Sequence, residues 1–205
     1  MEKIRELMAA LDDEELLNEV QKELDAGTAP AEIITACQEG MTEIGNMFSK
    51  GEMFVSDLMM AGAICKEVSE TVKPYMKGDG AKKLGKVMIG TVKDDIHDIG
   101  KDIVISMLEA SGFEVIDMGV DVPAEDFVKG LQANPDCKVL GLSCLLASCY
   151  GSIKATVEAV RAAGLDTKII IGGGPIDQNV VEYSGANAMG GAAQDTVNYC
   201  KEAIC

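Results

Sequence analysis

The spacing of apolar residues changes once along this 205-residue chain, close to residue 80. Before that point, apolar side chains such as Ile4, Leu7 and Leu11 recur every three or four residues, which is the spacing of a helix with one buried side. After it, short apolar runs rich in β-branched residues alternate with helical segments. Two such patterns predict a helical unit followed by an α/β unit.

The N-terminal part contains four segments with helical spacing. Gly27 ends the second segment, Pro30 opens the third and Pro74 stops the fourth. Four helices with short connections favour a small antiparallel bundle, which we assign to residues 1–80. Residues 78–83 (GDGAKK) are glycine-rich and charged, and they predict a linker that can serve as a hinge.

The C-terminal part, residues 86–205, predicts a doubly wound, Rossmann-like or flavodoxin-like parallel sheet with helices on both faces. Strands are expected at residues 86–91, 113–117, 139–143, 168–171 and 186–189. Helices are expected at residues 101–111, 124–132, 151–163, 176–184 and 193–203. In such a sheet, ligands bind at the carboxyl ends of the strands. The loops at that edge are therefore where function is expected.

His97 is the only histidine of the chain, and it lies in the loop after the first predicted strand. An imidazole whose Nδ1–H is held by a carboxylate can ligate a metal through Nε2, and Asp95 can supply that carboxylate. Ser143 ends the third predicted strand at the same rim, so its hydroxyl can bond the carboxylate in turn. Because a closed metal site needs about four ligands, a lone histidine implies a metal that arrives already chelated.

Other interpretations of these loops remain open at this point. His97 could instead only cap its loop. Asp94 and Asp95 would also suit the magnesium and phosphorylation pocket of a response regulator, although that reading explains the histidine poorly. Gly172-Gly173-Gly174 permits close backbone approach to a bulky group, but it equally suits a tight turn with an anion site at a helix end. A G-x-G-x-x-G pattern does not follow the first strand, which disfavours a nicotinamide cofactor.

Composition limits the partners and the location. A formal net charge of -16 would repel phosphate backbones and acidic membranes, so neither nucleic acid nor a membrane is expected as a partner. The amino terminus lacks the apolar core of a signal peptide, and we expect a cytoplasmic protein. Seven cysteines without a C-x-x-C pair predict reduced, mostly buried thiols in preference to a metal site.

Three motifs in order resemble a known family. The pattern Asp95-x-His97-x-x-Gly100, then Ser143-x-Leu145, then Gly172-Gly173, resembles the cobalamin-binding signature D-x-H-x-x-G, S-x-L and G-G. The segment 1–77 resembles the helical cap that precedes this domain in methionine synthase. The two-part layout at this length resembles the corrinoid proteins of anaerobic three-component methyltransferase systems. Two departures stand out: Ala147 and Ser148 occupy the region of a methionine synthase threonine, and Ser56 stands where the cap often has proline.

The resemblance implies a cobalamin or related corrinoid whose lower nucleotide base is displaced, with His97 as the axial ligand of cobalt. It implies a proton relay of Asp95, His97 and Ser143. The implied cofactor-binding positions are Asp95, Ile96, His97, Asp98, Ile99, Gly100, Ser143, Leu145, Ser148, Gly172, Gly173 and Gly174, with Gly190, Gly191 and Ala192 closing the base pocket. Residues placed over the upper corrin face are Phe54, Leu58, Met59 and Met60, whose alternative is plain bundle core.

The function that the resemblance implies is a methyl carrier that is not catalytic alone. A substrate-specific methyltransferase would load a methyl group onto cobalt, a second methyltransferase would pass it on, with tetrahydrofolate as the expected acceptor, and a reductive activator would restore the cobalt. Aryl methyl ethers, methylamines, glycine betaine and methanol remain open as donors. The alternatives are a cobalamin-dependent sensor or regulator, for which the chain offers no basic output module, and the small subunit of a cobalamin mutase.

Overall fold

The computed structural model describes residues 1–76 and 83–204, and within it the chain divides into two compact units. The first comprises Met1–Lys83 with Glu109–Gly112, and the second comprises Leu84–Leu108 with Phe113–Cys205. All but the last residue of the predicted linker, 78–83, lies outside the described residues.

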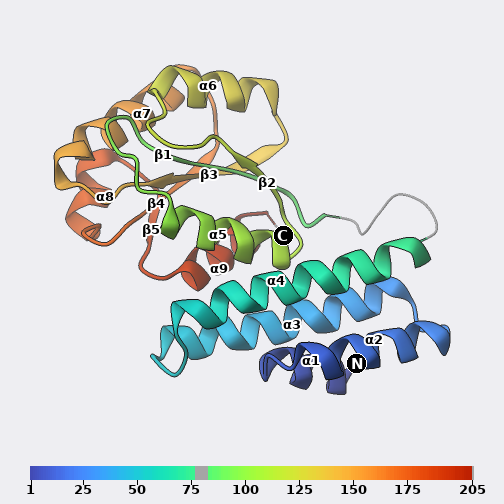
Figure 1. Cartoon of the computed structure of the whole chain (residues 1–205). Helices are drawn as coiled ribbons and strands as arrows, with labels where there is room; N and C mark the ends of the chain where they lie inside the picture. Colours follow the sequence, from blue (N-terminus) through green and yellow to red (C-terminus); the bar gives the residue numbers. More distant parts are fainter. Residues whose placement is uncertain (77–82, 205) are drawn as a thin grey trace. The chain divides into compact units, whose positions relative to one another are not determined.

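The first unit is helical, as predicted (Figure 1). Its elements are α1 (Glu2–Ala9), α2 (Asp13–Asp25), α3 (Pro30–Ser49), α4 (Val55–Val72) and the short 3-10 helix η1 (Lys73–Tyr75). Asp12 caps α2 by accepting a hydrogen bond from the amide of Glu15, and Pro30 occupies the first turn of α3. The apolar stripes predicted from helical spacing form the core, which includes Ile4, Met8, Leu16, Val20, Ile33, Met41, Ile44, Ala61 and Val68.

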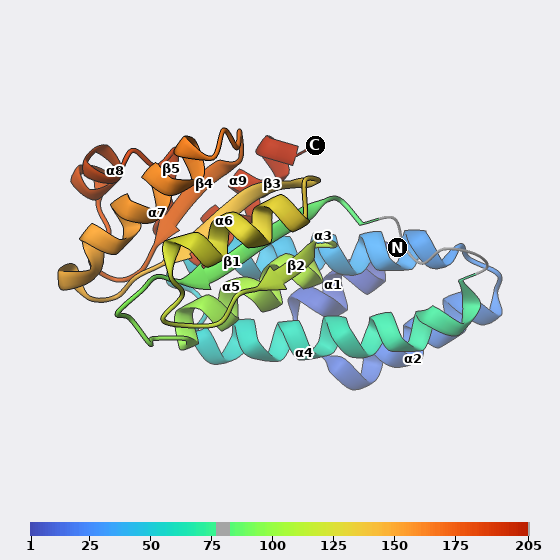
Figure 2. The ribbon, with the colours of Figure 1, turned by 90° about the horizontal axis from the view of Figure 1, so that it is seen from above.

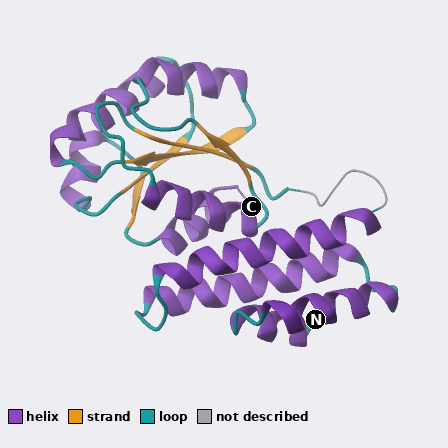
Figure 3. Ribbon diagram, in the orientation of Figure 1, coloured by secondary structure: helices purple, strands orange, loops and turns teal. Residues whose placement is uncertain are grey.

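The second unit contains a five-stranded sheet in which every strand pair is parallel, with the order β2-β1-β3-β4-β5. Its strands are drawn in orange in Figure 3. The strands are β1 (Lys86–Thr91), β2 (Glu114–Asp117), β3 (Cys137–Ser143), β4 (Lys168–Gly172) and β5 (Ala188–Gly190). The helices are α5 (Ile99–Ala110), α6 (Ala124–Ala133), α7 (Tyr150–Ala162), α8 (Gln178–Ser184) and α9 (Ala193–Ile204). The predicted fold class is therefore confirmed.

Helices cover both faces of the sheet, with α6, α7 and α8 on one side and α5 and α9 on the other (Figures 1 and 2). Because side chains alternate along a strand, every second residue faces the side covered by α6, α7 and α8. Leu140 and Leu142 of β3 pack there with Phe127 of α6 and Ile153 of α7. None of the helices in the described part of the chain is both long and apolar enough to cross a bilayer.

Most element boundaries of the second unit differ from the prediction by one or two residues, and three differences stand out. Helix α5 begins at Ile99, so Gly100 lies in its first turn and not in the preceding loop. A short 3-10 helix, η2 (Ala147–Cys149), precedes α7. Strand β5 begins at Ala188, later than predicted; just before it, the Asn187 side chain accepts a hydrogen bond from the Ile169 amide and the Asn187 amide donates to the Ile169 carbonyl, both at 2.8 Å.

Candidate functional site

The carboxyl edge of the sheet brings together residues that are far apart in sequence. In the strand register, Thr91 pairs with Ser143, Ser143 with Gly172, and Gly172 with Gly190. These four residues form one row across the sheet, as parallel strands ending at one edge require. The loop that carries His97 leaves the sheet from this row.

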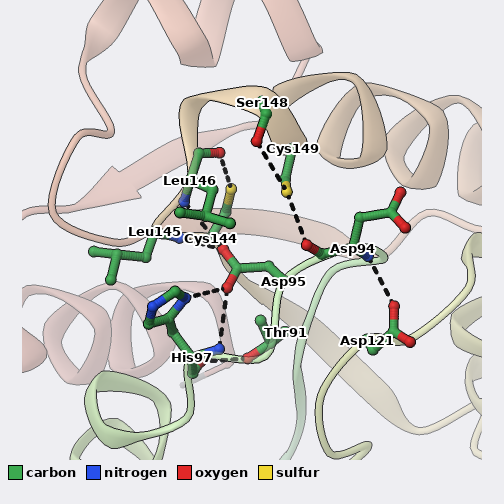
Figure 4. A network of polar contacts seen from close by, with 10 residues as sticks. All are labelled: Thr91, Asp94, Asp95, His97, Asp121, Cys144, Leu145, Leu146, Ser148 and Cys149. Carbon is green, nitrogen blue, oxygen red and sulfur yellow. Dashed lines mark hydrogen bonds and ion pairs between the residues drawn. The ribbon is translucent and has the colours of Figure 1, made fainter.

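His97 and Asp95 form the central contact of this edge (Figure 4). Nδ1 of His97 lies 2.6 Å from Oδ1 of Asp95, and the His97 amide donates to the same oxygen at 3.0 Å. The Asp95 side chain is fully buried, whereas 49% of the His97 side chain is exposed. Among the described residues Nε2 of His97 has no hydrogen-bond partner, so this nitrogen can serve as a ligand.

The buried carboxylate of Asp95 is surrounded by donors. Burial alone would raise its pKa, but hydrogen bonds from His97 and from the amides of Leu145 and Leu146 outweigh that effect and hold the pKa well below its usual range. Oδ2 accepts from the Leu145 amide at 2.6 Å and from the Leu146 amide at 3.1 Å. Asp95 is therefore a fixed anion that orients the imidazole and favours the tautomer with the proton on Nδ1.

The structure differs from the prediction at Ser143. Its hydroxyl makes no hydrogen bond to any residue that the structure describes, because the two loop amides of Leu145 and Leu146 already occupy Oδ2 of Asp95. Ser143 instead contributes through its backbone, whose carbonyl accepts from the Val92 amide at 3.1 Å. The predicted relay thus has backbone amides where a hydroxyl was expected.

Other residues that hold the His97 loop were not predicted as site residues. The Thr91 hydroxyl donates to the His97 carbonyl at 3.0 Å, and Sγ of Cys149 donates to the Asp94 carbonyl at 3.3 Å. Asp121 contacts the same loop from the connection between β2 and α6. Nothing in the sequence marks Thr91 or Cys149 for these contacts. The signal available for Asp121 was that aspartate tolerates the left-handed backbone of tight turns.

Large apolar side chains on the loops after β1 and β3 are exposed. Ile96 is 71% exposed and Ile99 is 73% exposed, while Leu145 and Leu146 are also exposed. Asp98, Gly100 and Ser148 share this exposed rim. A cluster of exposed apolar side chains indicates a surface that a ligand or partner covers. Exposed apolar surface on the loops that hold His97 and Asp95 suits a broad, largely apolar ligand that presents a metal.

The predicted glycines differ in how much room their surroundings leave for a Cβ atom. Gly173 has a φ of 139°, and a Cβ there would overlap the carbonyl oxygen of Cys144, so only glycine fits. Gly100 is the opposite, since a Cβ there would meet no heavy atom within 4 Å and would project into open space. A Cβ at Gly174 would lie 3.2 Å from Cδ1 of Leu145, and one at Gly190 would overlap the Thr196 hydroxyl.

The turn after Gly190 is set by the start of α9. Asp195 accepts a hydrogen bond from the Ala192 amide at 2.8 Å, which caps this helix. A Cβ at Gly191 would lie 3.4 Å from Oδ2 of the same Asp195. Gly190, Gly191 and Ala192 therefore form the last turn at the carboxyl edge, in line with the placement expected for them.

Residues predicted for the upper corrin face lie at the start of α4. Phe54, Met59 and Met60 are 76%, 60% and 48% exposed, so they do not serve as bundle core. Leu58 does not agree with its predicted place, because it is only 1% exposed and lies on the buried stripe of α4 with Ala61 and Cys65. Helical spacing explains the difference, since positions 58, 61 and 65 share one side of the helix.

Six of the seven cysteines are described, and all six are buried free thiols. Cys37 and Cys65 lie in the helical unit with their sulfur atoms 3.3 Å apart. Burial raises the pKa of Cys137 to about 11 and that of Cys200 to about 12. In the part of the chain that the structure describes, no group of three or more His, Cys, Asp or Glu side chains could hold a metal ion.

Family models match both parts of the chain. One model described as a B12 binding domain matches residues 85–198, and a second with the same description matches residues 1–73. Among curated proteins, trimethylamine corrinoid protein 1 of Methanosarcina acetivorans is 37% identical, over 91% of this chain and 88% of that protein.

Solved structures give the same picture. A cobalamin-binding protein from Desulfitobacterium hafniense has a TM-score of 0.88 and 36% identity, covering 100% of this chain and 98% of that one. The methanol:cobalamin methyltransferase complex MtaBC from Methanosarcina barkeri has a TM-score of 0.84 and 26% identity, covering 98% of this chain and 78% of that one.

Proposed function

This chain belongs to the B12-binding protein family, and on that premise we propose that it is the corrinoid methyl carrier of a methyltransferase system that acts on a methylated amine. The observation that carries this proposal is His97, whose Nδ1 is held by the buried carboxylate of Asp95 while Nε2 is available on a half-exposed ring. In this role the chain serves two enzymes and is not catalytic alone.

The residues of the carboxyl edge fit a corrinoid. Ile96 and Ile99 offer exposed apolar surface beside the imidazole for the corrin ring. Gly100 leaves open space at the first turn of α5, where the displaced nucleotide tail could pass. The row that contains Ser143, Gly172 and Gly190 would line its path toward the base pocket. His97 would be the axial ligand, with the lower base of the corrinoid displaced.

Bound cobalt supplies the ability to accept and release a methyl group, and the protein supplies orientation and control of the axial ligand. Asp95 keeps the proton on Nδ1 of His97 and so leaves the Nε2 lone pair free for cobalt. His97 and Asp95 would form the proton relay of the site, with the amides of Leu145 and Leu146 behind the carboxylate. Exposed Phe54, Met59 and Met60 are proposed to shield the methyl group.

The partners follow from the carrier role. The 37% identity to a trimethylamine corrinoid protein supports a methylamine methyltransferase as the enzyme that loads the carrier, with methanol as the other donor represented among the relatives. A second methyltransferase would remove the methyl group, and tetrahydrofolate remains the proposed acceptor. A reductive activator would restore oxidised cobalt. None of the three relatives described above is named as a regulator or a mutase subunit.

The axial assignment has a direct test because the chain has one histidine. Protein labelled with ¹⁵N-histidine would be loaded with cobalamin, reduced to the cobalt(II) state and examined by EPR. If His97 is the ligand, the three-line nitrogen splitting of unlabelled protein becomes a two-line splitting. If the nucleotide base of cobalamin is the ligand, three lines persist and the assignment is wrong. His97→Ala serves as the control that must lose the labelled signal.

The donor assignment needs a separate measurement. Loaded protein reduced to cobalt(I) would be mixed with a trimethylamine methyltransferase and trimethylamine, or with a methanol methyltransferase and methanol. The proposal predicts methylation of cobalt in the first mixture and little methylation in the second. The absorbance of the corrinoid measures the methylation in each case. Methylation with methanol alone would overturn the amine assignment while leaving the carrier role intact.

A further inference from the structure

The loop that presents His97 contains a strained residue next to the axial-ligand motif. Asp94 has a φ of 70°, in the left-handed region. Most residues with a side chain avoid this conformation, and at Asp94 neighbouring contacts hold it. Asp94 directly precedes Asp95. The orientation of the peptide between them therefore determines the direction in which the Asp95 side chain leaves the backbone.

Asp121, in the connection between β2 and α6, holds this loop at two backbone positions. Oδ1 of Asp121 accepts from the Asp94 amide at 2.8 Å, and the Asp121 amide donates to the Asp95 carbonyl at 2.9 Å. Asp121 itself has a φ of 55°. Figure 4 shows its carboxylate directed at Asp94 from the neighbouring chain segment.

We propose that Asp121 is a positioning residue for the axial imidazole. By fixing the backbone on both sides of the Asp94–Asp95 peptide, it sets the direction of the Asp95 carboxylate and through it the orientation of the His97 ring. This inference rests on the proposed role of His97 as the cobalt ligand. The hydrogen bonds of Asp121 that hold this part of the chain go to Lys93, Asp94 and Asp95 and not to the imidazole, so it would act through the loop.

Asp121 also makes an ion pair with Lys93, and this ion pair does not account for the proposed positioning role. Lys93 approaches Oδ1 at 2.7 Å, but its side chain is 46% exposed and that of Asp121 is 44% exposed. Exposed pairs of this kind contribute little to stability. The hydrogen bond from the Asp94 amide also has a charged acceptor, and unlike the ion pair it acts on the backbone of the His97 loop. Lys93→Gln therefore removes the ion pair and leaves the proposed positioning contact in place.

The test uses the full chain loaded with cobalamin and measures the ratio of His-on to His-off cobalt(II) by the EPR splitting of ¹⁵N-histidine-labelled protein. Asp121→Ala is expected to lower this ratio by about tenfold or more, as loss of a charge-assisted hydrogen bond would. Asp121→Asn keeps an acceptor oxygen and should restore much of the ratio. Lys93→Gln should match the unmodified protein.

Asp121→Gly provides a second variant if Asp121→Ala does not fold, because glycine adopts a φ of 55° without strain and still lacks the acceptor. An unchanged His-on ratio in Asp121→Gly would overturn the inference. An equal loss in Lys93→Gln would also overturn it, since the ion pair would then be the cause. If unmodified protein itself shows no labelled nitrogen signal, it is the axial role of His97 that fails.

Discussion

The backbone nitrogen of Leu145 lies 2.6 Å from Oδ2 of Asp95, although the two residues are 50 positions apart in the chain. This contact joins the loop after β1 to the loop after β3 and completes the set of donors around the buried carboxylate. Because the donor is a backbone amide, any residue at position 145 except proline could supply it. The support of the imidazole is therefore a property of the fold at this edge.

The first prediction concerns Asp95→Asn. An amide cannot accept from all four donors, so we expect the free energy of unfolding of the unliganded protein to fall by about 1.5–3 kcal/mol near neutral pH. The pKa of Asp95 is lowered in the folded state, so its contribution is present above the unfolded value and is lost as pH falls through the folded value. The difference in free energy of unfolding between wild type and Asp95→Asn, called the gap below, should thus narrow as pH falls below about 4.

Urea unfolding at a series of pH values measures this gap. Lys93→Gln, at an exposed position, is the control that should show little difference from wild type at any pH. A gap that widens toward acid pH would contradict the assignment of Asp95 as a stabilising anion.

Gly100→Ala should separate stability from cofactor binding. A Cβ at Gly100 meets nothing in the protein, and alanine favours a helix by up to about 1 kcal/mol over glycine, so stability should stay the same or rise. If the nucleotide tail passes this turn, the same methyl group should weaken cobalamin binding. Gly151→Ala, also in a helix and facing open space, is the matched control for affinity. Equal affinity in both variants would show that the tail takes another path.

Gly173→Ala should damage the fold itself. The added Cβ would overlap the Cys144 carbonyl, and the φ of 139° is a conformation that alanine avoids, so a loss of at least about 2 kcal/mol is expected. The neighbouring Gly174→Ala would bring its Cβ against the flexible end of Leu145, and it should cost much less. Thermal unfolding of the two variants compares them, and similar melting temperatures would argue against the close contact at Gly173.

The cysteines should react slowly in the native protein. Burial raises the pKa of Cys144 to about 12, so its thiol stays protonated near neutral pH, and the other described cysteines are also buried. Iodoacetamide should therefore label none of these six quickly, as intact mass after timed quenching would show, whereas urea-unfolded protein should be labelled fully. Raised thiol pKa values also predict that stability falls as pH rises from about 9 toward 12.

Much of the fold followed from the sequence because it depends on local patterns. The helical stripes of the first unit, including Met8 and Val20, and the strands that start at Lys86 and Lys168 are set by apolar periodicity. Alternation of strand and helix then leaves a parallel sheet as the arrangement that buries both kinds of apolar surface. The same spacing puts Leu58 on the buried stripe of α4 with Ala61 and Cys65, so its placement over the corrin was not what local periodicity favours.

The sequence by itself determined that His97 and Asp95 form one unit, since they lie two residues apart and the motif resembles the B12-binding signature that the family models match. Only the tertiary structure decided what holds that unit. The amides of Leu145 and Leu146 replaced the predicted Ser143 hydroxyl, and Asp121 reached the loop from another strand connection. Backbone donors carry no residue identity, so contacts of this kind appear only when chain segments distant in sequence meet at the edge of the sheet.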